Sequence, residues 1–139
     1  MQYWLIKTEP EEWSWKDQIK CSKKGSVWDG VRNFQARNNL KAMNADDLCF
    51  FYHTGKEKKI IGIVKVIKEY FPDKNDKKQN FGSIMVRSNK KFKLPVDLKD
   101  IKKHRLLRHL PLIKQSRLSV MKIDAKSWKI ICKMGKINP

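Results

Sequence analysis

Residues 3–10 have the sequence YWLIKTEP, in which an almost unbroken apolar run meets a polar turn. Tyrosine, tryptophan, leucine and isoleucine favour β-structure, so residues 2–6 are predicted to form a short buried strand. Pro10 cannot donate a ladder hydrogen bond and biases Glu9 toward an extended conformation, so the strand must end before it. A polar tripeptide, Lys7–Glu9, therefore stands at the end of a buried strand.

Apolar periodicity and capping residues predict the other elements. Four helices are expected behind the N-capping residues Ser14, Asn33, Asp97 and Asp124, namely 15–20, 34–43, 98–103 and a final helix that Gly135 would cap. Further strands are expected over 48–53, 60–70, 82–88, 92–96 and 118–123, with irregular chain over 21–32 and 72–80. Strands separated by single helices and hairpins favour an α+β fold in which a small mixed barrel carries helices outside. No repeat or linker interrupts residues 1–139, so we expect one domain.

Composition excludes several classes of protein. The 139 residues are 40% hydrophobic and 33% charged, which supports a packed core and argues against intrinsic disorder. No apolar window is long enough for a transmembrane helix, and the N-terminal apolar run is too short for a signal peptide. Cys21, Cys49 and Cys132 are odd in number and far apart, which favours reduced thiols over disulfides or zinc. We therefore expect a cytoplasmic protein, free or nucleoid-associated, with no metal site and no cofactor.

The basic charge favours a polyanionic partner. Thirty-two Lys and Arg residues against 14 Asp and Glu give a net charge of +18. Lys outnumbers Arg 26 to 6, and because an A/T-rich genome would also raise Lys, the total is weak evidence. The distribution is more informative, because residues 79–139 hold sixteen basic and three acidic residues. That concentration is what one phosphate-facing surface requires, although a solvated lysine-rich surface would have the same composition.

Three polar clusters carry the chemistry of a candidate site: Lys7–Pro10, Trp28–Asn33 and Ser116–Ser119. Trp28 is the most informative residue, because an indole in a glycine turn has few core neighbours there. It either folds back over the core, as most Trp residues do, or serves as a stacking plate for a planar ligand such as a nucleobase. Arg32 likewise has two interpretations, a phosphate contact or an ion pair with Asp29 or Asp47.

Four segments in order resemble the EVE domain family: YWLIKTEP at 3–10, WDGVRN with QARN at 28–38, FFYH at 50–53 and QSRLSVM at 115–121. The resemblance runs from about Tyr3 to Gly135. It implies a PUA-like fold, a mixed pseudo-barrel with short helices that is related to the YTH readers of methylated RNA. It also implies recognition of a modified base, chiefly a modified cytosine in DNA. Two positions depart from the family pattern: Asp46 stands where glycine is usual, and Phe81 where a cage residue is often Trp.

The resemblance assigns roles to the three clusters. Trp28 would form one wall of an aromatic pocket, and Lys7, Thr8 and Glu9 would face the edge of the base. The remaining base-binding positions would be Asp29, Gly30, Val31 and Asn33. The residues that would form the rim and contact the flanking phosphates are Arg32, Arg37, Ser116, Arg117 and Ser119. The hypothesis is thus a non-enzymatic, monomeric module that binds a flipped base, in DNA rather than RNA.

Two other functions stay open at this stage. PUA-like folds also bind RNA, so the partner could be a tRNA or rRNA. A small nucleoside hydrolase or deaminase would need a general base together with a nucleophile or a metal. Glu9 and Asp29 are the acids near the clusters, no His or Cys lies within them, and Cys49 stands in an apolar run typical of an inert buried thiol. The sequence therefore predicts no catalytic residue.

Overall fold

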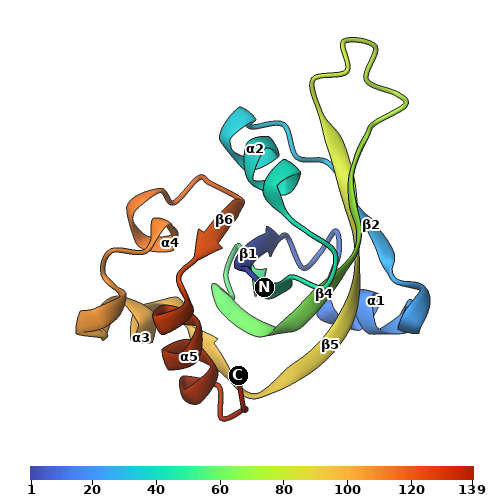
Figure 1. The fold of residues 1–139 in the computed structure, drawn as a ribbon. Helices are drawn as coiled ribbons and strands as arrows, with labels where there is room; N and C mark the ends of the chain where they lie inside the picture. The colour runs from blue at the N-terminus through green and yellow to red at the C-terminus, as the bar shows by residue number, and fades with distance from the viewer.

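A computed structural model describes residues 1–139, which form six strands (Figure 1). They are β1 (Tyr3–Thr8), β2 (Ser26–Trp28), β3 (Leu48–His53), β4 (Lys59–Pro72), β5 (Gly82–Asp97) and β6 (Val120–Ile123). They make one mixed sheet in the order β2-β5-β4-β3-β1-β6. The parallel pair is β1 with β3, and every other neighbouring pair is antiparallel. The long strands β4 and β5 curve around the core, and their hairpin projects beyond it.

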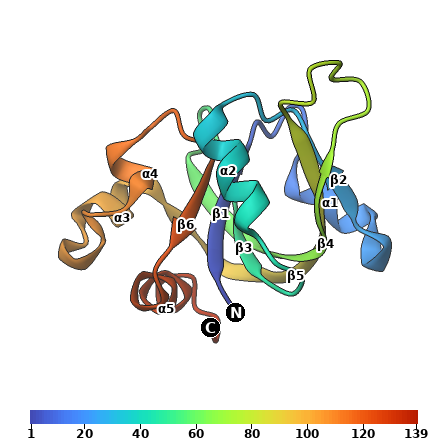
Figure 2. The same ribbon diagram turned by 45° about the horizontal axis from the view of Figure 1, so that its top comes forward.

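Five α-helices lie outside this sheet (Figure 2). They are α1 (Trp15–Lys20), α2 (Phe34–Ala42), α3 (Leu98–Lys103), α4 (Pro111–Lys114) and α5 (Ala125–Met134). The four expected N-caps are confirmed, because each of those side chains accepts a backbone N–H of the first helical turn. Two short 3-10 helices cover Ser22–Lys24 and Arg105–Leu107. None of the helices has the length and apolar character that crossing a membrane requires.

The predicted elements need three corrections. Residues 82–88 and 92–96 belong to one continuous strand, β5, because the polar residues between them face outward while the pairing with β4 continues through bulges. Strand β2 lies within the stretch expected to be irregular; three residues carry too little alternation to be detected from sequence. Helix α4 was not predicted and has no side-chain cap, although Pro111 at its start is a recognised signal.

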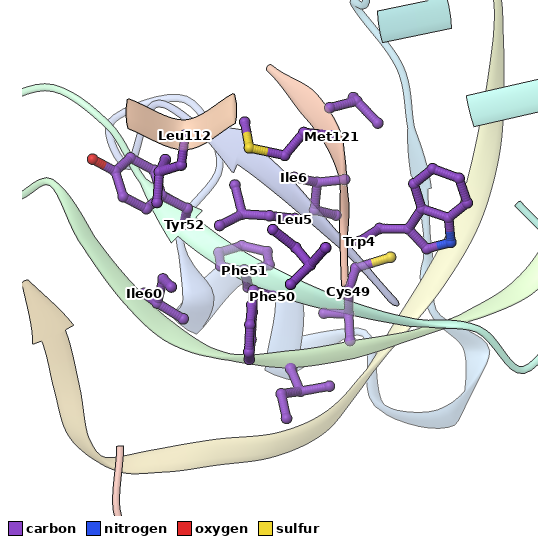
Figure 3. Close-up of a cluster of buried hydrophobic side chains, with 14 of the residues drawn as sticks. Trp4, Leu5, Ile6, Cys49, Phe50, Phe51, Tyr52, Ile60, Leu112 and Met121 are labelled. Carbon is purple, nitrogen blue, oxygen red and sulfur yellow. The ribbon is translucent and has the colours of Figure 1, made fainter. Parts of the chain in front are cut away.

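The core is built around the central strands (Figure 3). The ring of Trp128 from α5 stacks on Phe50 at a centroid distance of 3.8 Å and on Tyr3 at 4.5 Å. Gly135 ends α5 as predicted, but in a right-handed conformation, so glycine is not required there by a positive φ. A Cβ at Gly135 would lie 2.4 Å from the Phe92 ring. Glycine therefore permits the close approach of α5 to β5.

One buried carboxylate ties the start of the chain to the β3 strand. Asp47 is 2% exposed and accepts hydrogen bonds from Trp4 Nε1 at 3.0 Å, Gln2 N at 3.1 Å and Asn44 N at 3.0 Å. Its neighbour Asp46 has a φ of 75°, the left-handed conformation that favours glycine. The departure at Asp46 from the family pattern thus falls on a turn whose backbone suits glycine best.

Asp124 makes stability depend on acid pH. Burial raises the pKa of Asp124, but hydrogen bonds from His109 and Ser127 outweigh that effect and hold the pKa at about 2. A lowered carboxyl pKa contributes stability above its unfolded value of 3.8 and loses it as the pH falls through the folded value. We expect Asp124→Asn, which keeps a capping oxygen, to lower the free energy of unfolding by about 0.5–1 kcal/mol at neutral pH, a small cost because the carboxylate is half exposed.

Urea unfolding at a series of pH values tests this. The stability difference between the wild type and Asp124→Asn should shrink as the pH falls below 3.8 and disappear below about 2. Glu11→Gln, at an exposed acid for which the structure shows no hydrogen bond or ion pair, is the matched control and should follow the wild type throughout. A stability difference that stays constant with pH would contradict the lowered pKa of Asp124.

Candidate functional site

A cavity of about 590 Å³ opens where β1 ends, beside the edge strand β2. Its volume falls in the range of about 300–1,000 Å³ that is typical of small-molecule sites. Four separate segments of the chain build it: the end of β1, the turn before α1, β2 with the loop after it, and the residue before β6. The lining residues are Lys7, Thr8, Glu12, Trp13, Val27, Trp28, Asp29, Gly30, Val31, Arg32, Asn33 and Ser119.

Trp28 forms an inner wall of the cavity. It is the last residue of β2 and pairs with Ile84 of β5, so strand alternation turns its ring inward and leaves Val27 48% exposed. The indole is only 6% exposed and packs edge-on against Phe51 at a centroid distance of 5.6 Å. The expectation of a loop residue open to solvent was therefore wrong. The ring is mostly core, and a small part of it borders the cavity.

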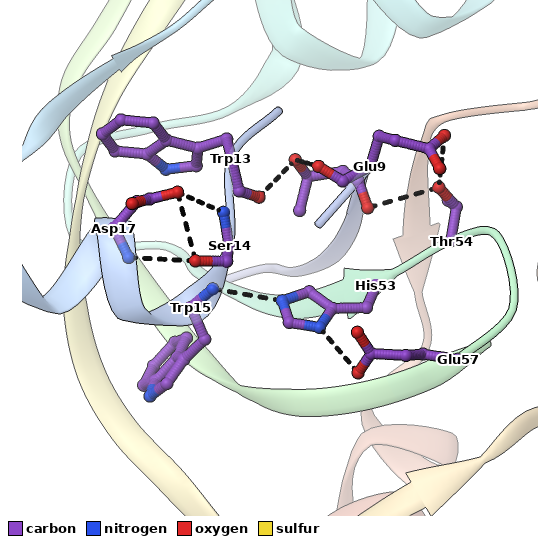
Figure 4. Close-up of polar contacts among 9 residues, drawn as sticks. Glu9, Trp13, Ser14, Trp15, Asp17, His53, Thr54 and Glu57 are labelled. Carbon is purple, nitrogen blue, oxygen red and sulfur yellow. Dashed lines mark hydrogen bonds and ion pairs between the residues drawn. The ribbon is translucent and has the colours of Figure 1, made fainter. Parts of the chain in front are cut away.

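Trp13 is a second aromatic wall, which the sequence analysis did not select as a site residue. It is half-buried, and its Nε1 donates to Gln18 Oε1 at 2.9 Å. Its carbonyl accepts the Thr8 hydroxyl at 2.8 Å, and this bond closes the turn between β1 and α1 (Figure 4). A sequence signal was present: Trp13 precedes the N-cap Ser14, so it lies outside the helix and has no helical face on which to pack.

Lys7 and Thr8 reach the cavity from the end of β1. Lys7 Nζ donates to the carbonyl of Ser116 at 2.9 Å and lies 5.7 Å from the ring centroid of Tyr52. Burial lowers the pKa of Lys7. The ammonium group has three donors, of which the carbonyl takes one. Two donors are thus left for a ligand with acceptor atoms.

Glu9 does not line the cavity, contrary to the expected role at the edge of a base. Its carboxylate accepts the Thr54 hydroxyl at 3.3 Å, at the start of the β3–β4 turn, as Figure 4 shows. The chain reverses after Thr8, so the side chains of Thr8 and Glu9 leave the strand in different directions. The acid that borders the cavity is instead Glu12, which the sequence analysis did not select.

The loop after β2 brings the second predicted cluster to the cavity. Asp29, Gly30 and Val31 line it, and Gly30 adopts a φ of 77°. Asn33 lines it as well, although its side chain is used as the cap of α2, accepting Ala36 N at 2.9 Å. Arg32 pairs with Asp73 at 3.6 Å, so neither of the two partners considered for it, Asp29 and Asp47, is correct.

The third cluster is divided between the cavity and a hollow next to it. Ser119 lines the cavity, whereas Ser116 and Arg117 line a shallower hollow of about 290 Å³. The two share Asn33, so they are contiguous. Arg37 lines neither of them: its Nη1 donates to the carbonyl of Asn80 at 2.9 Å, which ties α2 to the β4–β5 hairpin.

Charge is balanced inside the cavity and positive beside it. Lys7 and Arg32 oppose Glu12 and Asp29 among the cavity residues. The charged residues of the adjoining hollow are two bases, Lys114 and Arg117. A cavity with two indoles and no net charge suits a flat, uncharged group, whereas the basic hollow suits phosphate. The expected positive rim is thus confined to one side.

A further hollow of about 470 Å³ lies between the β3–β4 turn and α3. Five lysines line it together with Glu57, Asp97 and Leu98, but no aromatic residue does: Lys56, Lys58, Lys59, Lys99 and Lys102. Without an aromatic wall it offers no stacking surface for a planar ligand. The cavity that Trp13 and Trp28 line is therefore the stronger candidate for a base.

The cysteine and histidine side chains lie away from this cavity. Cys49 is fully buried, and burial raises the pKa of its thiol. His53 is 6% exposed; its Nε2 accepts the backbone N–H of Trp15 at 3.1 Å, and its Nδ1 lies 3.1 Å from Glu57 Oε1 (Figure 4). No group of three or more His, Cys, Asp and Glu side chains is placed to hold a metal ion.

Comparison with known proteins gives the family. The EVE domain family model matches residues 2–134. The chain belongs to the EVE domain family. This EVE domain is 30% identical, over 99% of its length, to thymocyte nuclear protein 1 of Gallus gallus, of which it covers 70%. The corresponding protein of Mus musculus is also 30% identical over 99% of the chain, which covers 75% of it.

Solved structures agree with this assignment. A protein of Agrobacterium tumefaciens superposes on the EVE domain with a TM-score of 0.95 at 37% identity, covering 100% of this chain and 97% of its own. Human THYN1 protein, crystallised in complex with 5-methylcytosine-containing DNA, superposes with a TM-score of 0.88 at 27% identity over 100% of both chains. A YTH domain from Zygosaccharomyces rouxii, at 16% identity and a TM-score of 0.60, shares the fold alone. The predicted α+β, PUA-like fold and family are confirmed.

Proposed function

We propose that this EVE domain is a non-enzymatic nucleic-acid-binding module that accepts one modified base, a modified cytosine in DNA, between Trp13 and Trp28. The observation that carries the proposal is the cavity itself, in which two indole walls and several hydrogen-bonding groups surround a space of about 590 Å³. Its shape and neutrality suit a nucleobase, whose faces are apolar and whose edge is polar.

The comparison with human THYN1 protein supports the choice of ligand. That protein was crystallised with DNA containing 5-methylcytosine, and the two chains superpose over their whole length. The proposal extends this binding to the present chain because the cavity brings together residues from all three predicted clusters. Lys7 and Thr8 come from the first cluster, the Trp28 segment from the second and Ser119 from the third.

Recognition would require the base to leave its stack. Extrusion from a duplex costs a few kcal/mol, and contact with the two indoles offsets part of it. Lys7 would donate to an acceptor on the base edge, whereas Glu12 and Asp29 would accept from an amino group. A methyl group adds about 0.8 kcal/mol when it is fully buried, so discrimination between methylated and plain cytosine would be about fourfold from burial alone.

The flanking backbone would lie over the basic hollow. Ser116 and Arg117 are exposed there, beside Lys114 and contiguous with the cavity at Asn33. Contacts of this kind position the strand and carry no sequence information. Affinity would therefore fall as salt is raised, because each phosphate contact displaces condensed counterions.

A binding series at one fixed salt concentration tests the proposal. The probes are DNA strands of one sequence that carry either 5-methylcytosine or cytosine, with the RNA counterparts. We expect methylated DNA to bind at least about fourfold more tightly than unmethylated DNA, since one buried methyl group supplies that much. Arg117→Gln is the control variant: it should weaken all the probes alike and leave the methylation preference unchanged.

Three results would count against the proposal. Equal affinity for methylated and plain cytosine would show that the protein does not recognise the modification. Tighter binding of the RNA probes would assign the module to RNA. Turnover of a modified nucleoside, abolished in Glu12→Gln, would make the protein an enzyme that uses the acid bordering the cavity.

A further inference from the structure

An aromatic–arginine cluster lies on the surface beside the cavity. It consists of Phe34, Phe81, Arg32 and Arg37. The rings of Phe34 and Phe81 have their centroids 5.1 Å apart, with an angle of 31° between their planes. The Arg37 guanidinium lies 4.8 Å from the centroid of Phe34, and that of Arg32 lies 5.5 Å from the centroid of Phe81. Phe81 thus stands outside the cavity, although the resemblance placed its position in the base cage.

The exposure of this cluster is unusual for its composition. Phe34, the first residue of α2, is 54% exposed, and Phe81 is only half-buried. A single exposed apolar side chain needs no explanation. Here, however, two aromatic rings lie together with a guanidinium group over each of them. Flat rings combined with positive charge form the surface that single-stranded nucleic acids use for stacking.

The cluster is held in place from two elements. Arg37 donates from Nη1 to the carbonyl of Asn80 at 2.9 Å, and Arg32 pairs with Asp73 at 3.6 Å. Phe81 N donates to Asp76 Oδ2 at 2.9 Å, which closes the turn of the hairpin. These contacts hold the end of the β4–β5 hairpin against the start of α2, and both views of the fold show the hairpin rising beside this helix (Figures 1 and 2).

The cluster begins where the cavity wall ends. Arg32 and Asn33 both line the cavity, and Phe34 is the next residue in the chain. Because consecutive Cα atoms are about 3.8 Å apart, the Phe34 ring is attached one residue beyond the wall. A strand that places one base in the cavity would therefore bring a neighbouring base to this surface.

We propose that Phe34 and Phe81 form a stacking surface for the base next to the one held in the cavity. This inference rests on the function proposed above and adds a second nucleotide position to it. Arg37, which pairs with no carboxylate, complements the negative charge of the strand at this point, whereas Arg32 is already paired with Asp73. The ligand is thus a modified base together with its stacked neighbour, and the second position tolerates any base because every base has a flat face.

A fluorescent base analogue placed next to the modified base tests the inference. A short single-stranded DNA carries 5-methylcytosine with 2-aminopurine on its 5′ side, and a second strand has it on the 3′ side. In the wild type we expect one of these strands to lose fluorescence on binding, because 2-aminopurine is quenched when it stacks. Phe34→Ala should abolish the quenching and weaken binding of that strand by about tenfold, the loss of one base–aromatic stack.

Two controls separate this position from the cavity. The free nucleoside 5-methyl-2′-deoxycytidine has no neighbouring base, so the wild type and Phe34→Ala should bind it equally. Leu94→Ala removes another exposed apolar side chain, 50% exposed on β5 and outside both hollows, and should leave binding unchanged. Phe34→Leu keeps apolar bulk without a flat face, so it should also lose the quenching.

The outcomes distinguish the two proposals. If the wild type binds methylated DNA selectively, but neither strand is quenched or Phe34→Ala binds as tightly, the stacking surface is wrong and the cavity proposal stands. If the wild type shows no selectivity, both proposals fail. If Phe34→Ala abolishes self-association in sedimentation and leaves DNA binding intact, the cluster is a contact between copies of the chain and the inference is overturned.

Discussion

Trp28→Ala is expected to lose more than about tenfold in affinity for DNA containing a modified base, the loss of a base–aromatic contact. The ring is mostly buried against Phe51, so its removal also leaves a void in the core. Large-to-small substitution at a buried aromatic residue costs about 3–5 kcal/mol. The variant should therefore be less stable as well as weaker in binding. Affinity is measured by titration at a temperature at which urea unfolding shows the variant to be folded.

A matched core variant separates these two effects. Phe92→Ala deletes another buried aromatic ring, 2% exposed and outside the cavity. It should lose a similar amount of stability but bind DNA normally once folded. Trp28→Phe keeps most of the packing and should fall between the wild type and Trp28→Ala in affinity. If folded Trp28→Ala binds DNA with the affinity of the wild type, the Trp28 indole does not contribute to binding and the proposed function is wrong on this point.

Asp47→Ala is expected to cost about 3–5 kcal/mol of folding free energy without touching the cavity. Three donors lose their acceptor, and one of them, Trp4 Nε1, is buried on a residue that is 2% exposed. A hydrogen bond to a charged group contributes about 1.5–3 kcal/mol, and a buried donor left without a partner costs about 1–3 kcal/mol. Thermal unfolding should show a midpoint lowered by about 10 °C or more.

Asp46→Asn provides the comparison, because Asp46 is exposed and asparagine accepts its left-handed backbone. It should change the midpoint little. Folded Asp47→Ala should keep the DNA affinity of the wild type. A midpoint within about 2 °C of the wild type would show that water replaces the three hydrogen bonds, contrary to the buried position of the carboxylate.

Local signals predicted most of the fold. Each predicted N-cap begins a helix, and the apolar run of β3 matches the expected strand. The predictions that failed concern strands whose formation depends on residues distant in sequence. Strand β2 exists because β5 offers an edge to pair with, and β5 is continuous because β4 runs beside its polar middle. Three residues of β2 cannot show that by themselves.

The sequence predicted which segments form the site but not which of their side chains face the cavity. The sequence placed the Lys7 and Trp28 clusters together through a family resemblance, and both of them line the cavity. It could not show that Glu9 turns toward Thr54 while Glu12 borders the cavity, because one reversal of the chain decides which side chains face inward. Trp13 was missed although its place before the N-cap Ser14 indicated that it lies outside α1. These directions follow from backbone hydrogen bonds in the turn, which composition does not encode.

The electrical neutrality of the cavity has a consequence for how the protein would search a long strand. Dissolved ions compete with the basic surface for phosphates, but they have little to compete for between the two indoles. Raising the ionic strength would thus shorten the time spent on any stretch of strand while leaving the ratio between a marked base and an unmarked one almost unchanged. Search and discrimination would then be adjusted separately, the first by the composition of the medium and the second by the shape of the cavity alone.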